Sequence, residues 1–127
     1  MAYKIYLVDD DRFLLDMYAV KFKAAGHEVI ANQGGEELMK TLKDKGAPDA
    51  VLLDIIMPGM NGFEVLEKIR KENLLPAATK VIILSNQGQD ADIAKAKELG
   101  AAGYIVKASA IPSEVLTETI SLIEKKA

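Results

Sequence analysis

Four short apolar runs of this sequence each end in side chains that can do chemistry. The first run is followed by Asp9 and Asp10, a middle one by Asp54, and two later ones by Ser85 and Lys107. If these runs are parallel strands of one sheet, the five side chains meet at its carboxyl edge although they are far apart in the chain. The pattern therefore predicts one composite site rather than four separate ones.

The carboxylates indicate a site for a hard divalent cation. Asp9, Asp10 and Asp54 repel one another when they lie close together, and a cation among them offsets that repulsion. A donor set of oxygen atoms suits Mg²⁺, which keeps several waters and needs few protein ligands. The backbone carbonyl of Ile56 is a candidate additional ligand, because the Ile56 side chain is apolar and offers none.

Ser85 and Lys107 predict that an anion binds at the same place. A hydroxyl donates one hydrogen bond, and an ammonium group is a compact positive charge. Together with Mg²⁺ they suit a phosphoryl group, whose transfer depends mainly on positioning and charge neutralisation. Asp54 stands alone at its strand end whereas Asp9 and Asp10 are paired, so Asp54 is the predicted nucleophile and would form an aspartyl-phosphate.

The elements that must position these residues alternate between strands and helices. We expect strands at residues 4–8, 28–31, 49–53, 80–84 and 103–106, several of them continuous Val/Ile/Leu runs typical of parallel strands. Segments of helical periodicity follow each strand. This alternation predicts an α/β fold, a doubly wound (βα)5 three-layer sandwich with right-handed crossovers.

Two features of the expected helices can be checked directly. The apolar face of the first helix is expected to contain Phe13, Met17, Val20 and Ala24. Asn61 is the expected N-cap of the third helix.

The composition limits the classes of function. The chain has 127 residues and a net charge of -3, with acidic and basic residues interspersed. Without a basic stripe or a polybasic cluster, neither a nucleic acid nor a membrane surface is an expected partner. The sequence has no cysteine and a single histidine, His27, which excludes thiol chemistry and His-cluster metal sites. We therefore expect one domain over residues 1–127, located in the cytoplasm.

Four motifs, in order along the chain, make the sequence similar to a known family. They occupy residues 7–11, 53–62, 84–85 and 104–107, and each contains the end of an expected strand. The sequence resembles the response-regulator receiver domains of two-component signalling over essentially its whole length. The resemblance implies a flavodoxin-like fold whose five parallel strands have the order 2-1-3-4-5.

The resemblance also gives a role to each site residue. Asp54 corresponds to the phosphoacceptor, and Asp9 and Asp10 correspond to the acids that bind Mg²⁺. Lys107 corresponds to the lysine that binds the phosphoryl group, and Ser85 to the hydroxyl that follows it on activation.

The same resemblance implies partners. A sensor histidine kinase or a phosphotransfer protein would dock near the first helix and donate the phosphoryl group. Ser85 would then move, and Tyr104 corresponds to the aromatic residue that changes rotamer. The face built from the fourth helix, fifth strand and fifth helix would change shape and would then bind a different downstream protein. The implied protein is a signalling phosphoacceptor rather than an enzyme, and a monomer or a weak dimer that depends on phosphorylation.

The sequence departs from the family pattern near the site. The family usually has proline after the lysine, but Ala108 follows Lys107, and a cis bond before a non-proline residue costs about 3 kcal/mol. We expect either a trans bond with an altered loop or a strained cis bond. Asn86 stands where a very small residue is usual, and would narrow access to the site or add a hydrogen bond. Ile56 and Gln87 occupy the positions thought to tune phosphoryl lifetime, and apolar Ile56 is expected to lengthen it.

Three other classes of function share part of this pattern of residues. A Mg²⁺-dependent phosphohydrolase with an aspartate nucleophile needs a second Asp two residues later, where Ile56 stands. A flavodoxin-like nucleotide binder needs a glycine- or hydroxyl-rich loop after the first strand, where the acids starting at Asp9 would repel the ligand. A receiver-like interaction scaffold that no longer takes phosphate stays open, because of Asn86 and the missing proline after Lys107.

Overall fold

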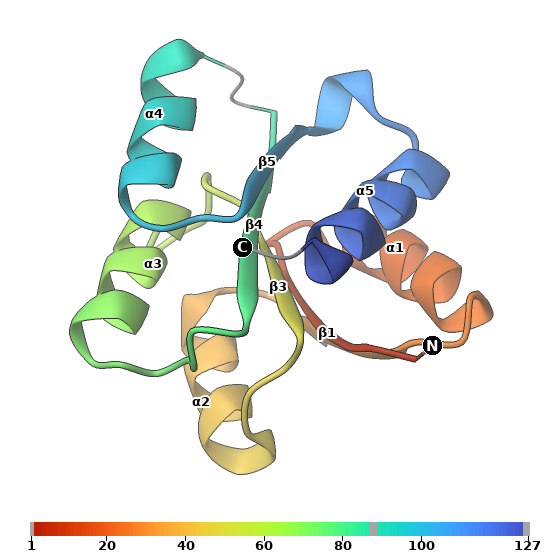
Figure 1. Cartoon of the computed structure of the whole chain (residues 1–127), viewed down its shortest axis with the longest axis horizontal. Coiled ribbons are helices and arrows are strands. Elements are labelled where there is room, and N and C mark those ends of the chain that lie inside the picture. The colour runs from red at the N-terminus through yellow and green to blue at the C-terminus, as the bar shows by residue number, and fades with distance from the viewer. Residues whose placement is uncertain (1, 87–88, 126–127) are drawn as a thin grey trace.

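The computed structural model describes residues 2–86 and 89–125, and they form one parallel sheet with helices on both faces (Figure 1). The elements are, in order, β1 (Lys4–Val8), α1 (Arg12–Ala24), β2 (Glu28–Asn32), α2 (Gly35–Lys45), β3 (Ala50–Leu53), α3 (Gly62–Lys71), β4 (Lys80–Ser85), α4 (Asp90–Glu98), β5 (Gly103–Val106), a 3-10 turn (Lys107–Ser109) and α5 (Pro112–Glu124). The predicted alternation of strands and helices is confirmed, with strand ends shifted by one residue at most.

The strand order is β2-β1-β3-β4-β5 and all neighbouring strands are parallel. This confirms the predicted doubly wound fold and its order. Helices α1 and α5 cover one face of the sheet, and α2, α3 and α4 cover the other (Figure 1). The order reverses beside β1, so the carboxyl ends of β1 and β3 flank the crevice where such sheets bind ligands.

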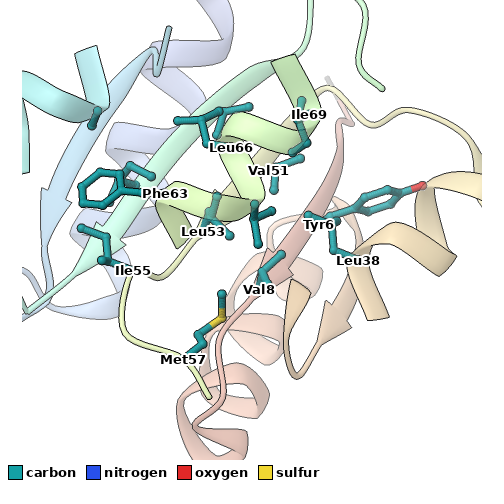
Figure 2. Close-up of a cluster of buried hydrophobic side chains, with 14 of the residues drawn as sticks. Tyr6, Val8, Leu38, Val51, Leu53, Ile55, Met57, Phe63, Leu66 and Ile69 are labelled. Atoms are coloured by element: carbon teal, nitrogen blue, oxygen red, sulfur yellow. The ribbon is translucent and has the colours of Figure 1, made fainter. Parts of the chain in front are cut away.

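Two apolar layers hold the helices to the sheet. One layer contains Leu38, Leu66 and Ile69 against Val51 and other inward residues of the strands, and Figure 2 shows it in close-up. The second layer lies under α1 and α5 and contains twelve buried residues. Because both faces of the strands are covered, β1, β3 and β4 are almost fully apolar, as expected for parallel strands.

The helix ends follow the chemistry of their sequences. The Asn61 side chain accepts a hydrogen bond from the Glu64 backbone N–H, and the Glu64 carboxylate accepts one from the Asn61 N–H, which confirms the predicted N-cap as a capping box. No helix in the described part of the chain is both long enough and apolar enough to cross a membrane.

The predicted inward face of α1 is wrong. Phe13 is 75% exposed and Val20 is 69% exposed, and Met17 is also on the outer side. The buried residues of the helix are Leu15, Tyr18 and Phe22. Two apolar rows run along α1, and periodicity alone does not tell which one packs on the sheet. The outer row therefore remains on the surface of the molecule.

Candidate functional site

A pocket of about 320 Å³ opens at the carboxyl ends of the strands, and we call it the acid pocket. Its lining residues come from four strand ends and the start of α1: Asp9, Asp10, Asp11, Leu14, Asp54, Ile56, Ser85, Asn86 and Lys107. Backbone pairing fixes the position of its acids, since the Asp54 N–H donates to the Val8 carbonyl at 2.9 Å and the Asp9 N–H to the Asn32 carbonyl at 3.1 Å. The sheet thus brings together the acids, the hydroxyl and the lysine that the sequence predicted.

Asp54 follows β3 and is only 6% exposed. Its Oδ1 accepts a hydrogen bond from the Ile55 N–H at 2.8 Å. Burial raises the pKa of Asp54 to about 6, and the negative charge of Asp9 also raises it. The positive charge of Lys107 lowers this pKa, but by a smaller amount. Gly62 packs close behind, because a Cβ there would lie 2.2 Å from the Asp54 carbonyl oxygen. The turn after β3 therefore requires glycine at this place.

Lys107 joins the acids of β1 and β3. Its Nζ lies 3.4 Å from Asp54 Oδ2 and also donates a hydrogen bond to Asp9 Oδ2. Burial alone would lower the pKa of Lys107, but the hydrogen bond to Asp9 and the charge of Asp54 outweigh it, and the pKa is raised. The lysine is therefore held charged, with its ammonium group directed into the pocket.

The carboxylates are arranged so that a divalent cation fits among them. One oxygen each of Asp9, Asp10 and Asp54 lies within 4.8 Å of the others. Opposite ligands of Mg²⁺ are about 4 Å apart, so small side-chain movements suffice to complete such a donor set. The Asp11 N–H donates to Asp9 Oδ1 at 2.9 Å and orients that carboxylate. The chemistry and the spacing of this oxygen set fit a hard cation.

The structure separates the remaining predicted residues into two groups. Ser85 is 1% exposed and lines the acid pocket together with Ile56, whose side chain is 60% exposed at its mouth. Tyr104 does not line the pocket. It is half-buried on β5 between two outer grooves, and burial together with the charges of Asp92 and Asp54 raises its pKa.

The loop after Lys107 takes the first of its two expected forms. The Lys107–Ala108 bond is trans, and the chain continues into the 3-10 turn Lys107–Ser109. A second cleft of about 540 Å³ lies between this turn and α1, and it shares Asn86 and Lys107 with the acid pocket. Asn86 is exposed, and Gln87 lies outside the described residues.

Two pocket residues were not predicted. Asp11 is the N-cap of α1, and its side chain accepts hydrogen bonds from the Phe13 and Leu14 N–H groups. It also lines the acid pocket, as does Leu14. The spacing of Leu14 from Asp11, one turn into the helix, is the signal that would have pointed to it.

Comparison with known proteins identifies the family. The model of the response regulator receiver domain matches residues 5–120. The chain belongs to this family. It is a receiver domain of two-component signalling. The receiver domain is 33% identical over 103 residues to the transcriptional regulatory protein AfsQ1 of Streptomyces coelicolor, covering 81% of this chain but only 44% of that protein. It therefore spans less than half the length of that relative.

Solved structures agree with this assignment. The Vibrio cholerae chemotaxis protein CheY4 is 27% identical with a TM-score of 0.83, over 96% of this chain and 99% of that one. A CheY-like receiver domain protein of Methanospirillum hungatei is 26% identical with a TM-score of 0.85, and the match covers 98% of this chain and 95% of that one. A BeF3-activated DrrB receiver domain is 30% identical with a TM-score of 0.81, and the match covers 98% of this chain and 100% of that one.

Proposed function

We propose that the receiver domain takes a phosphoryl group onto Asp54 from a phosphohistidine of a sensor kinase or a phosphotransfer protein. Asp9, Asp10, Asp54 and the backbone carbonyl of Ile56 are the proposed ligands of Mg²⁺. The proposed unit is one domain, residues 1–127, that catalyses only its own phosphorylation and dephosphorylation. The proposed location is the cytoplasm, where the ATP that charges a histidine kinase is found.

One observation carries this proposal. A nearly buried carboxylate, Asp54, opens into the same pocket as two further acids, a hydroxyl and a lysine whose Nζ is 3.4 Å away. The raised pKa of Asp54 means that the carboxylate is poorly solvated, which favours its attack on an electrophile. Since the pKa stays at about 6, Asp54 is still ionised at neutral pH.

In the proposed reaction an Asp54 oxygen attacks phosphorus, and the bond from phosphorus to the imidazole nitrogen of the donor breaks. The nitrogen leaves with the electron pair and takes up a proton. When bound, Mg²⁺ would neutralise negative charge on the phosphoryl oxygens and the carboxylates. Lys107 exchanges part of its pairing with Asp54 for a phosphoryl oxygen, and Ser85 donates a hydrogen bond to another. Water later hydrolyses the aspartyl-phosphate.

The outer row of α1 supports a protein donor. Phe13, Met17 and Val20 leave apolar side chains on the surface of this helix, and Ile111 before α5 is 61% exposed. Leu14 lines both the acid pocket and the neighbouring cleft, so this part of α1 adjoins the pocket. Exposed apolar groups beside a reactive site are typical of a protein interface. We propose that the donor protein docks here.

The proposed output face consists of α4, β5 and α5. Tyr104 lies on this face between a groove of about 530 Å³ against α5 and one of about 190 Å³ against α4. Phosphorylation of Asp54 would shift Ser85 and Tyr104 and thereby change the downstream protein that binds. A monomer, or a weak dimer that forms on phosphorylation, is the proposed assembly.

The proposal is tested by incubating the chain with Mg²⁺ and acetyl phosphate and measuring intact mass. We expect the addition of one phosphoryl group, and none in Asp54→Asn. Equal labelling of Asp54→Asn would contradict the assignment of the phosphoacceptor. No labelling of the unaltered chain would favour the interaction scaffold, and repeated turnover of a phosphate ester would favour a phosphohydrolase.

A further inference from the structure

Helix α4 is held firmly at its C-terminal end. Gly100 follows the helix with a φ of +88°, and its N–H donates to the Lys97 carbonyl at 3.0 Å. The Ala101 N–H donates back to the Ala96 carbonyl at 2.9 Å. Together these hydrogen bonds form a Schellman motif, which satisfies carbonyls that a helix end otherwise leaves without partners.

Arg70 of α3 completes the capping of this end. Its Nε donates to the Leu99 carbonyl at 3.0 Å, and its Nη2 donates to the Gly100 carbonyl at 2.8 Å. A guanidinium group is suited to this task, because it is planar and offers several donors in a fixed arrangement. Its charge also interacts favourably with the negative end of the α4 dipole. A second contact joins the two helices, since Lys95 lies 4.8 Å from the ring centroid of Phe63.

The N-terminal end of α4 is held much less firmly. Gln89 is its N-cap residue, and its side chain makes no capping hydrogen bond. The acidic residues of the first turn are Asp90, which is exposed, and Asp92, which is half-buried, and their charges interact favourably with the helix dipole by only a modest amount. Ala96 is the buried residue of the helix, whereas Ile93 is 38% exposed. Few buried contacts, and among the described residues no side-chain cap from Gln89, favour movement of the first turns.

The weakly held end is also the end that the chain connects to the acid pocket. Ser85 and Asn86 line that pocket, and α4 begins at Asp90. The firmly held end is the opposite, C-terminal end of α4, where Arg70 of α3 is hydrogen-bonded to it. Both helices pack on the same face of the sheet (Figure 1). A change at Ser85 therefore reaches α4 at the end that can yield.

We propose that Arg70 is a positioning residue that fixes the pivot of α4. When the acid pocket is occupied, the first turns of α4 swing, while Leu99 and Gly100 stay hydrogen-bonded to Arg70. This inference rests on the proposed function, because it needs a phosphoryl group or its mimic at Asp54. Arg70 does not touch the phosphoryl group, and it acts through the helix that it anchors.

The test is amide hydrogen exchange measured by NMR, with and without Mg²⁺ and beryllofluoride. In the unaltered chain we expect the Asp92 and Ile93 amides to change their exchange rates by about tenfold or more, and the Leu99 and Ala101 amides by less than about twofold. In Arg70→Ala we expect Leu99 and Ala101 to exchange about tenfold faster even without beryllofluoride. The response to beryllofluoride should then extend along the whole helix.

Two further variants separate a pivot from general support of the fold. Arg70→Lys keeps the charge but cannot bridge two carbonyls in the same way, so we expect only partial protection of Leu99. Lys71→Ala removes the neighbouring exposed cation, and we expect exchange as in the unaltered chain. The pivot is overturned if Leu99 and Ala101 respond to beryllofluoride as strongly as Ile93 does. The pivot is also overturned if the Leu99 and Ala101 amides exchange at the same rates in Arg70→Ala as in Lys71→Ala.

Fluorine NMR of the same samples reports whether beryllofluoride is bound. If it is bound and the C-terminal amides of α4 respond as strongly as the others, the pivot fails while the proposed function stands. If it is not bound to the unaltered chain, the proposed function fails and the pivot fails with it.

Discussion

Nζ of Lys107 lies 3.4 Å from Oδ2 of Asp54, and the same ammonium group is hydrogen-bonded to Asp9. One lysine thus bridges the acids that follow two neighbouring strands. It offsets their repulsion only in part, because burial still raises the pKa of Asp54 to about 6. The pocket is therefore arranged for binding an additional positive charge at some expense of stability, as is common at functional sites.

Asp54→Asn should stabilise the metal-free protein at pH 7. The pKa of Asp54 rises from 3.8 to about 6 on folding, so the folded chain binds more protons than the unfolded chain between these values. The resulting loss of stability is fully present above about pH 6 and disappears below about pH 4. Because the pocket is open to solvent, we expect a gain of about 1 kcal/mol in the free energy of unfolding, and a melting temperature a few degrees higher.

Thermal unfolding in EDTA at pH 7 and pH 4 measures this effect. The two proteins should differ at pH 7 and converge at pH 4. Added Mg²⁺ should raise the melting temperature of the unaltered chain more than that of the variant, because it binds the folded acid pocket. A variant that melts lower than the unaltered chain at pH 7 without metal would contradict the role given to burial.

Asp10→Asn should weaken Mg²⁺ binding by about tenfold or more, because it removes one anionic donor from a set of three. Asp11→Asn is the matched control. Asp11 adjoins the same pocket, but its Oδ1 serves as a cap by accepting from the Phe13 and Leu14 N–H groups, which an amide oxygen can also do. Calorimetric titration with Mg²⁺ should show near-unchanged affinity for this control. Equal weakening in both variants would mean that general charge, not coordination, sets the affinity.

Phe13→Ala should slow phosphorylation by a protein donor about tenfold and leave phosphorylation by acetyl phosphate unchanged. Phe13 is 75% exposed, so its truncation removes contact area for a partner without opening a cavity in the core. Lys23→Ala, at an exposed position of the same helix, is the control. Rates are measured with a histidine kinase that phosphorylates the unaltered chain. A variant slowed equally with both donors would remove the docking role of α1.

The sequence predicted the fold and the acids, hydroxyl and lysine of the acid pocket for one physical reason. Asp9, Asp54, Ser85 and Lys107 follow apolar runs, and parallel strands bring their carboxyl ends to one edge. The positions of these residues are therefore fixed by strand register, which the continuous apolar runs determine.

The features that the sequence did not predict depend on tertiary packing. Two apolar rows on α1 have the same period, and only contact with the sheet selects the row with Tyr18 and Phe22. The hydrogen bonds from Arg70 to α4 join residues about 30 positions apart, and nothing local to either segment signals them. The pairing of Lys107 with Asp9 was also missed, because the sequence showed both charges but not their distance.

Ile56→Asn should shorten the lifetime of the phosphorylated protein. The Ile56 side chain is 60% exposed at the mouth of the acid pocket, where a water must approach Asp54 to hydrolyse the aspartyl-phosphate. An apolar side chain cannot order that water, whereas an amide can hydrogen-bond it, so we expect hydrolysis to be about tenfold faster. Ile56→Val keeps the surface apolar and should leave the rate close to that of the unaltered chain. The decay of radiolabelled phosphoprotein after removal of the donor measures both variants, and an unchanged rate in Ile56→Asn would remove this role of Ile56.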